Sequence, residues 1–409
     1  MNQVEKTSNF VTWLIFLTTL TVVVISTISV IFPALILSNS QTVQDLESLG
    51  ISQKGPESFE IGVWAIPLII TNVIVFSMYF LYVKERLPNT LSNVLKKIFR
   101  IKISKKITFM IIGILLSIYI IGSAGELASE ENWGDYGGVK DKTENRSLEQ
   151  AFRSFDVPLK FFFLSSSLEI FDNIRVIPFL ASIAMLLLTY FVTSKISNSR
   201  FAGIVAFIIL LQSNLFLSYD TSATYENFWI LFYLLSLYLM YRFWSLSPVA
   251  YILSTLAKPL TLIFLPMSIV FILRAEIETK KKLMILLSYG IVVLISIVLV
   301  VSLGINVSGR EEAFSYQEFL MGFTSFAYQL RFDGLVLLFL IPLIFGLFIA
   351  SIKKIKNAES VMVLILGTLL ITPALAGFTV DTNQPYRFIS LIVFFAMGVG
   401  VLLSSKKQA

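Results

Sequence analysis

Residues 334–352 read GLVLLFLIPLIFGLFIASI, a run of 19 residues without a single charged side chain. At a helical rise of about 1.5 Å per residue, such a run is long enough to cross the roughly 30 Å hydrocarbon layer of a bilayer. Inside lipid the backbone must satisfy its own hydrogen bonds, so an apolar run of this length predicts a transmembrane helix.

Runs of the same kind recur along the whole chain. Hydrophobic residues make up 56% of the 409 residues and charged residues only 14%, and the mean hydropathy is +0.82. This composition lies outside the range of ordinary soluble domains and predicts an all-α, polytopic transmembrane helical bundle. The expected single spans are 11–37, 62–83, 107–124, 176–194, 201–217, 227–243, 283–304, 334–352, 360–378 and 387–403.

The apolar stretch from Pro248 to Leu273 is too long for one comfortable span, and Lys258 and Pro259 interrupt its middle. Proline removes a backbone donor and breaks helix continuity, and a lysine at that place puts a charge in hydrocarbon. The stretch is therefore interpreted as a tight pair of helices, which brings the total to about 12 spans.

The distribution of lysine and arginine predicts the orientation, because basic loops stay in the cytoplasm. The basic segments alternate with acidic or mixed ones along the chain. Every basic segment falls on the cytoplasmic side only if the 248–273 pair enters and leaves the membrane on that side. Both termini are then cytoplasmic, Lys258 sits at an outer turn, and the protein belongs in the cell membrane. The basic segments are Lys84–Lys106, Lys280–Lys282, Lys353–Lys356 and Lys406–Lys407.

The chain contains no cysteine and no histidine. Their absence excludes thiol catalysis, disulfides, histidine-based proton transfer and most transition-metal sites. Any chemistry must use carboxylates, lysine, arginine, tyrosine or hydroxyl groups. The net charge of +6 is attributed to cytoplasmic anchors facing anionic lipid, and no nucleic-acid partner is expected.

The segment 125–175 is the one predicted outer loop that is large enough to fold over the membrane surface. Its first part carries the acids Glu126, Glu130, Glu131 and Asp135 directly after a span. Its second part, from Ser147 to Phe171, mixes apolar residues at helical spacing with charges. That pattern is typical of helices that lie in the plane of the interface.

The order of these features resembles the C-class (GT-C) glycosyltransferases of the dolichyl-phosphate-mannose mannosyltransferase type. In that family an early span is followed by an outer loop with a catalytic acid, by interfacial helices with a Pro-Leu step, and by an arginine before the next span. Here Glu126 or the pair Glu130-Glu131, then Pro158-Leu159, then Arg175 fill those places.

The resemblance continues along 107–403, with residues 1–106 as an addition of two spans and a basic loop, and 404–409 as a tail. The stretch from Tyr219 to Tyr225 is similar to the family's outer Ala-Arg-Tyr signature, with Thr224 in place of the arginine. Lys258-Pro259 resembles its Thr-Lys-Pro element, and Tyr386-Arg387 its late Tyr-Arg motif. The acid site reads Gly-Glu-Leu-Ala-Ser-Glu-Glu, where the family often has an Asp-Glu pair.

The resemblance implies a sugar transfer from a polyprenyl (dolichyl) phosphate to a protein, lipid or glycan hydroxyl on the outer face, with inversion and without a metal or other cofactor. Such a transfer needs a carboxylate base and cations that hold the departing phosphate. The candidates for the base are Glu126, Glu130 and Glu131. The candidates for the phosphate are Lys258, Arg175 and Arg387, and further substrate contacts fall to Asp135, Pro158, Tyr219 and Tyr225.

Two other functions stay open. A secondary transporter also has broken helices and an intramembrane charge, which Lys258-Pro259 provides. A non-catalytic membrane subunit could keep the same scaffold, as the threonine at 224 allows. An enzyme needs its outer acids beside the cavity, whereas a transporter does not.

Overall fold

A computed structural model describes residues 3–32, 59, 61–145, 147, 150, 158–302, 314–323, 333–355, 357–377 and 385–404. These residues form helices and turns and no strand, as the composition predicts. The chain divides into two compact units, with Met1–Ile101 and Glu311–Ala409 in unit 1 and Lys102–Arg310 in unit 2. The N-terminal and C-terminal helices therefore belong to one unit.

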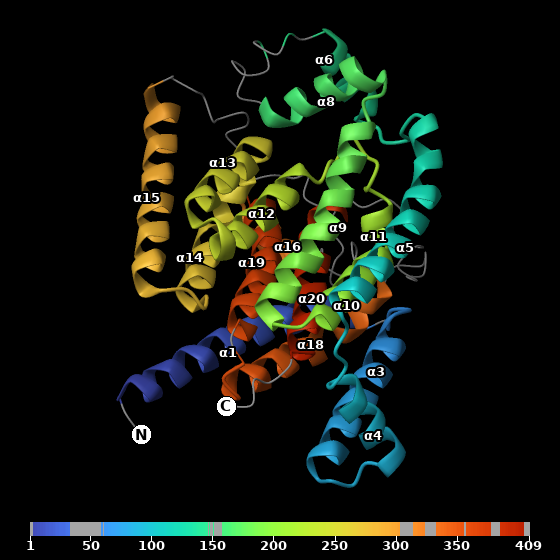
Figure 1. Ribbon diagram of the computed structural model, residues 1–409, viewed down its shortest axis with the longest axis vertical. Helices are drawn as coiled ribbons and strands as arrows, with labels where there is room; N and C mark the ends of the chain where they lie inside the picture. The colour runs from blue at the N-terminus through green and yellow to red at the C-terminus, as the bar shows by residue number, and fades with distance from the viewer. Residues whose placement is uncertain are drawn as a thin grey trace. The chain divides into compact units, whose positions relative to one another are not determined.

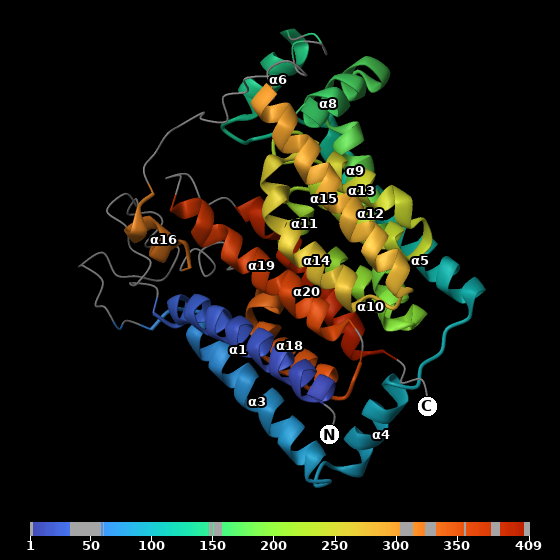
Figure 2. The ribbon, with the colours of Figure 1, turned by 90° about the vertical axis from the view of Figure 1, so that its left-hand side faces the viewer.

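Unit 1 is built around its last helix, whose side chains are almost all buried. In this unit α1, α3 and α18 lie side by side (Figure 2), and Phe16 of α1 stacks on Phe348 of α18 with ring centroids 3.9 Å apart. Its helices are α1 (Gln3–Ile31), α3 (Ala65–Val83), α4 (Asn89–Ile98), α16 (Tyr316–Gly322), α18 (Gly334–Ile352), α19 (Ala358–Ala376), η5 (Pro385–Phe388) and α20 (Ile389–Leu402).

Unit 2 has its core between α9, α10, α12 and α13 (Figure 1). Gly203 on α10 lets that helix approach α9 closely, because a Cβ there would lie 2.8 Å from the Tyr190 carbonyl oxygen. The helices are α5 (Lys105–Ala124), η2 (Gly125–Ala128), α6 (Tyr136–Asn145), α8 (Pro158–Phe171), α9 (Val176–Ser197), α10 (Arg200–Leu211), α11 (Asn214–Leu217), α12 (Phe228–Arg242), η3 (Trp244–Leu246), α13 (Ser247–Ala257), η4 (Pro259–Phe264), α14 (Leu265–Arg274) and α15 (Thr279–Ser302).

The chain reverses direction at Lys258-Pro259, as the break in the sequence predicts. Hydroxyls on α13 bond to carbonyls on α12 in antiparallel order, Ser254 to Trp229 at 2.6 Å and Ser247 to Ser236 at 2.9 Å. The following helix, α14, runs back beside α12, where Ser268 donates to the Tyr233 hydroxyl at 3.2 Å. The predicted pair of helices in 248–273 is thus confirmed.

Six helices among the described residues are long and apolar enough to cross a membrane. They are Phe10–Ile31, Ala65–Val83, Lys105–Ala128, Val176–Ser197, Gly334–Ile352 and Pro385–Leu402. Together with the shorter apolar helices they make this a membrane-embedded helical protein, whereas the total of about 12 spans stays a prediction. The expected span 201–217 is divided into α10 and α11, because the Ser213 hydroxyl accepts from the Phe216 amide and starts a new helix.

Candidate functional site

The acids of the predicted outer loop meet the loop between α11 and α12 at one end of unit 2. Glu131 lies at the centre of this meeting, and its side chain is only 2% exposed. Its carboxylate accepts from the Ser222 hydroxyl at 3.0 Å and from the Ala223 and Thr224 amides at 2.5 and 3.3 Å. Glu131 therefore fastens the two loops together and is shielded from solvent.

Arg175, the residue that precedes α9, completes this connection. Its Nε lies 3.6 Å from Glu131 Oε1 and donates to the Thr221 carbonyl at 3.0 Å. Its other donors reach the Thr221 hydroxyl at 2.6 Å, the Ser129 carbonyl at 2.6 Å and the Glu126 carbonyl. Arg175 is buried by these contacts and joins two other stretches, 126–131 and the loop at Thr221, to the start of α9.

Glu126 differs from Glu131 in its exposure, because it lies at the surface in η2. Its carboxylate accepts a hydrogen bond of 3.0 Å from the Thr221 hydroxyl, which in turn accepts from Arg175. We call Glu126, Glu131, Arg175, Asp220 and Thr221 the Arg175 cluster. Of the three acids in the cluster, Glu126 is the one exposed to solvent.

Asp220 is a buried member of the Arg175 cluster that the sequence analysis did not select. Its carboxylate accepts from the Ser123 hydroxyl at 2.9 Å. Burial raises the pKa of Asp220 to about 6, and the nearby negative charge of Glu126 acts in the same direction. An acid directly after Tyr219 in a predicted outer loop was the available signal.

This raised pKa predicts a pH-dependent stability. The folded protein binds the Asp220 proton more tightly than the unfolded chain, so the stabilisation is complete below about pH 4 and is lost as the pH rises through about 6. The uncharged Asp220→Asn variant should therefore unfold at a higher temperature than the wild type near pH 7.5, with a gain of up to about 3 kcal/mol. Near pH 5 about half of this difference should remain, and near pH 3.5 it should be small.

Thermal unfolding between about pH 3.5 and pH 7.5 measures this gap. Asp135→Asn is the matched control, since that acid is exposed and its removal should leave the gap near zero. An Asp220→Asn variant that follows the wild type at every pH would show that Asp220 does not titrate in this range.

Three aromatic rings gather beside the cluster. Trp133 stacks on Tyr219 with centroids 4.8 Å apart and an angle of 13° between the planes. Tyr225 meets Trp133 edge-on at 5.7 Å and donates its hydroxyl to Asp135 at 2.8 Å. Tyr219 is buried and Trp133 is partly exposed, so the aromatic group reaches the surface through Trp133, two residues before Asp135.

Helix α8 is fastened to the same loop by a second buried ion pair. Lys160 lies 2.7 Å from the Glu226 carboxylate and donates to the Thr224 carbonyl at 2.6 Å. Neither residue was selected from the sequence. Pro158 is the first residue of α8 and is buried, a position where proline is favoured because its fixed φ suits the first turn. Its place is explained by helix initiation.

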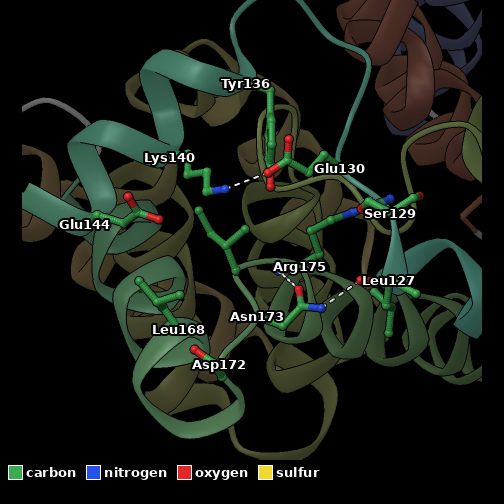
Figure 3. A pocket seen from close by; sticks show the side chains of 12 residues that line it. Leu127, Ser129, Glu130, Tyr136, Lys140, Glu144, Leu168, Asp172, Asn173 and Arg175 are labelled. Carbon is green, nitrogen blue, oxygen red and sulfur yellow. Dashed lines mark hydrogen bonds and ion pairs between the residues drawn. The ribbon is translucent and has the colours of Figure 1, made fainter.

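Glu130 has a different partner from Glu126 and Glu131. It is 73% exposed and pairs with Lys140 on α6 at 2.6 Å (Figure 3). The hydrogen bond from Lys140 lowers the pKa of Glu130 below its usual value. The pair lies at a pocket of about 200 Å³ that is also lined by Tyr136, Leu168, Asn173, Ser129 and Arg175, so this pocket borders the Arg175 cluster.

Lys258 lies at the turn after α13, with its ammonium 5.7 Å from the centroid of the Trp229 ring. Trp229 follows closely on Glu226 and Asn227, so Lys258 is at the same end of unit 2 as the Arg175 cluster. Arg387 belongs to η5 of unit 1, where its guanidinium lies 5.9 Å from the Tyr386 ring centroid. The cluster is built from residues of unit 2 alone.

No group of three or more acidic side chains that could hold a metal ion occurs in the described part of the chain. Comparison with protein-family models, with curated proteins and with solved structures finds no match to this chain. The fold and site therefore define its class, a membrane-embedded helical protein with a carboxylate and arginine cluster at one end of a helical unit.

Proposed function

We propose that this protein is a membrane glycosyltransferase of the GT-C kind. It would move a sugar from a polyprenyl phosphate to a hydroxyl of a protein, lipid or glycan on the extracytoplasmic face of the cell membrane. The observation that carries the proposal is that an exposed carboxylate, Glu126, and the cation Lys258 belong to the same end of unit 2. A transfer from a lipid phosphate needs both a base and a cation.

In this proposal Glu126 is the base. It takes the proton of the acceptor hydroxyl while the acceptor oxygen forms a bond to the anomeric carbon of the sugar. The bond from that carbon to the phosphate oxygen breaks on the opposite face, and the polyprenyl phosphate leaves with the bonding electrons. One displacement of this kind inverts the anomeric centre.

The contacts divide the remaining residues into two roles. Lys258 is the candidate for the phosphate, because an ammonium stabilises the negative charge that the leaving group develops. Arg175 and Glu131 are positioning residues, since their hydrogen bonds and ion pair are made to protein groups. The exposed part of Trp133 is suited to a sugar ring, which presents an apolar surface of C–H groups.

A transfer assay with the full chain in proteoliposomes tests the proposal. A panel of radiolabelled polyprenyl-phosphate sugars is offered with membrane lipids, glycans and peptides as acceptors, and covalent transfer of label is measured. Lys258→Ala should reduce transfer about 10- to 100-fold through the lost charge on the phosphate. Lys258→Arg, which keeps the charge, should retain most of it.

The same vesicles separate the alternatives. Absence of transfer from every donor, together with label that enters the vesicles unmodified, would support the transporter. Transfer that is indifferent to Lys258→Ala would refute the role given to this lysine. A chain that neither transfers nor transports any member of the panel would favour the non-catalytic subunit.

A further inference from the structure

Helix α4 leaves the end of a predicted span almost immediately. The span α3 ends at Val83, and only Lys84 to Pro88 separate it from α4. The chain turns sharply in this link (Figure 2), where Glu85 has a left-handed φ of 56°. A helix that begins only five linking residues after a helix of spanning length starts close to the membrane surface, near the depth of the lipid headgroups.

The helix has two chemically different faces. Leu91, Val94, Leu95 and Ile98 follow the i, i+3, i+4, i+7 spacing that puts side chains on one side of a helix. None of the residues of α4 is buried, and Leu91 and Val94 are 44% and 48% exposed. In the apolar stripe (Leu91, Val94, Leu95 and Ile98), Leu91 and Val94 are exposed and Leu95 and Ile98 half-buried, although the stripe is as regular as a core-facing one.

The opposite face is polar and basic. It carries Asn93, Lys96 and Lys97, with Arg100 just beyond the helix. Within Lys84–Ile101 there are five basic residues and one acid, Glu85. A helix with an apolar stripe and a basic face fits an anionic membrane surface, where the stripe enters the acyl region and the basic side chains reach the headgroups.

The neighbouring span supports a lipid environment. In α3 only 6% of the residues in the most apolar stretch are buried. Its attachment to α18 includes a hydrogen bond of 3.4 Å from the Asn72 amide to the Leu338 carbonyl. The rest of its surface is apolar and exposed, as a lipid-facing helix requires.

We infer that α4 is an anionic-phospholipid-binding helix that lies flat in the membrane surface, with the apolar stripe inserted below the headgroups and the basic face among them. A nucleic-acid partner would use the basic face and leave the apolar stripe in water. A membrane surface uses both faces at once, and the span that precedes α4 holds the helix at that surface.

The absence of cysteine from the chain makes a clean test possible. Single cysteines are introduced at Val94 on the apolar stripe and, as the matched control, at Asn93 on the opposite face. Each full-length variant is labelled with an environment-sensitive fluorophore. The variants are then reconstituted in vesicles of phosphatidylcholine alone or mixed with phosphatidylglycerol. Fluorescence quenching is measured with a lipid-attached quencher and with aqueous iodide.

In the mixed vesicles the lipid quencher should reach the Val94 label at least about twofold more effectively than the Asn93 label, and iodide should show the reverse order. In a background with Lys96→Gln, Lys97→Gln and Arg100→Gln, the ratio of inserted to water-exposed helix should fall about fivefold for each removed charge. The same weakening should follow from omitting phosphatidylglycerol.

Three results would overturn the inference. Equal quenching of both labels by iodide would mean that α4 stands in water. Protection of the Val94 label from both quenchers would mean that a protein surface covers the stripe. Insertion that is unchanged without phosphatidylglycerol and without the three charges would refute the recognition of anionic headgroups.

Discussion

Replacing Arg175 with alanine is expected to lower the free energy of unfolding by about 3–5 kcal/mol, the usual effect of removing one partner from a buried ion pair. The variant leaves the Glu131 carboxylate buried without its cation and removes the donors that bond the Ser129 and Thr221 carbonyls. Buried acceptors that lose their donors add to the loss. Thermal unfolding of the purified protein, followed by tryptophan fluorescence, measures the effect.

Two variants control this experiment. Arg175→Lys keeps the charge but not the planar fork, so it should recover only part of the stability. Arg200→Ala removes an arginine whose hydrogen bond to the Ile103 carbonyl is 3.2 Å long and exposed, and it should cost less than about 1 kcal/mol. An Arg175→Ala variant as stable as Arg200→Ala would show that the Arg175 cluster does not hold the two loops together.

Changing Glu126 to glutamine should reduce sugar transfer about 10²- to 10⁴-fold, because the amide cannot take the proton of the acceptor hydroxyl. The fold should tolerate the change, since the side chain is exposed and the Thr221 hydroxyl can donate to an amide oxygen as well. The measurement is the rate of label transfer at saturating donor, together with the melting temperature of the variant.

Glu130→Gln is the matched control for this substitution. Glu130 belongs to the same segment and is exposed, but its carboxylate pairs with Lys140 and makes no contact with Thr221 or Arg175 among the described hydrogen bonds and ion pairs. Its replacement should leave the transfer rate within about threefold of the wild type. If Glu130→Gln abolishes transfer while Glu126→Gln does not, the reacting hydroxyl binds in the pocket beside Glu130 and Lys140, and the assignment of the base is wrong.

The helical fold was largely predictable, because an apolar run of spanning length must satisfy its backbone hydrogen bonds internally in lipid and therefore forms a helix. The reversal at Lys258-Pro259 was predictable because a charge and a proline mark it locally in the sequence. Helix ends that depend on a single hydroxyl, such as the start of α11 at Ser213, leave no trace in hydropathy. The grouping of α1 with α18 and α19 depends on contacts between distant segments, which periodicity does not report.

The site was predictable only in part. The sequence indicated the acidic segment and Arg175, but three glutamates remained equivalent until their burial was known. Glu131 is enclosed and Glu126 is exposed, and a run of acids gives no hint of that difference. Asp220 and Lys160 were missed because each acts with a partner more than 60 residues away along the chain.

The small hydroxyls between α12, α13 and α14 bear on how this hairpin stays assembled. In a bilayer the acyl chains that surround a helix are as apolar as leucine. Exclusion of water therefore contributes little to the association of α13 with α12 there. Hydrogen bonds from Ser247, Ser254 and Ser268 to α12 do stabilise this association, each by roughly 0.6 kcal/mol in such surroundings. The association of these helices is therefore the sum of several weak polar contacts and close packing. Its stability should depend on temperature differently from that of a core formed by the exclusion of water.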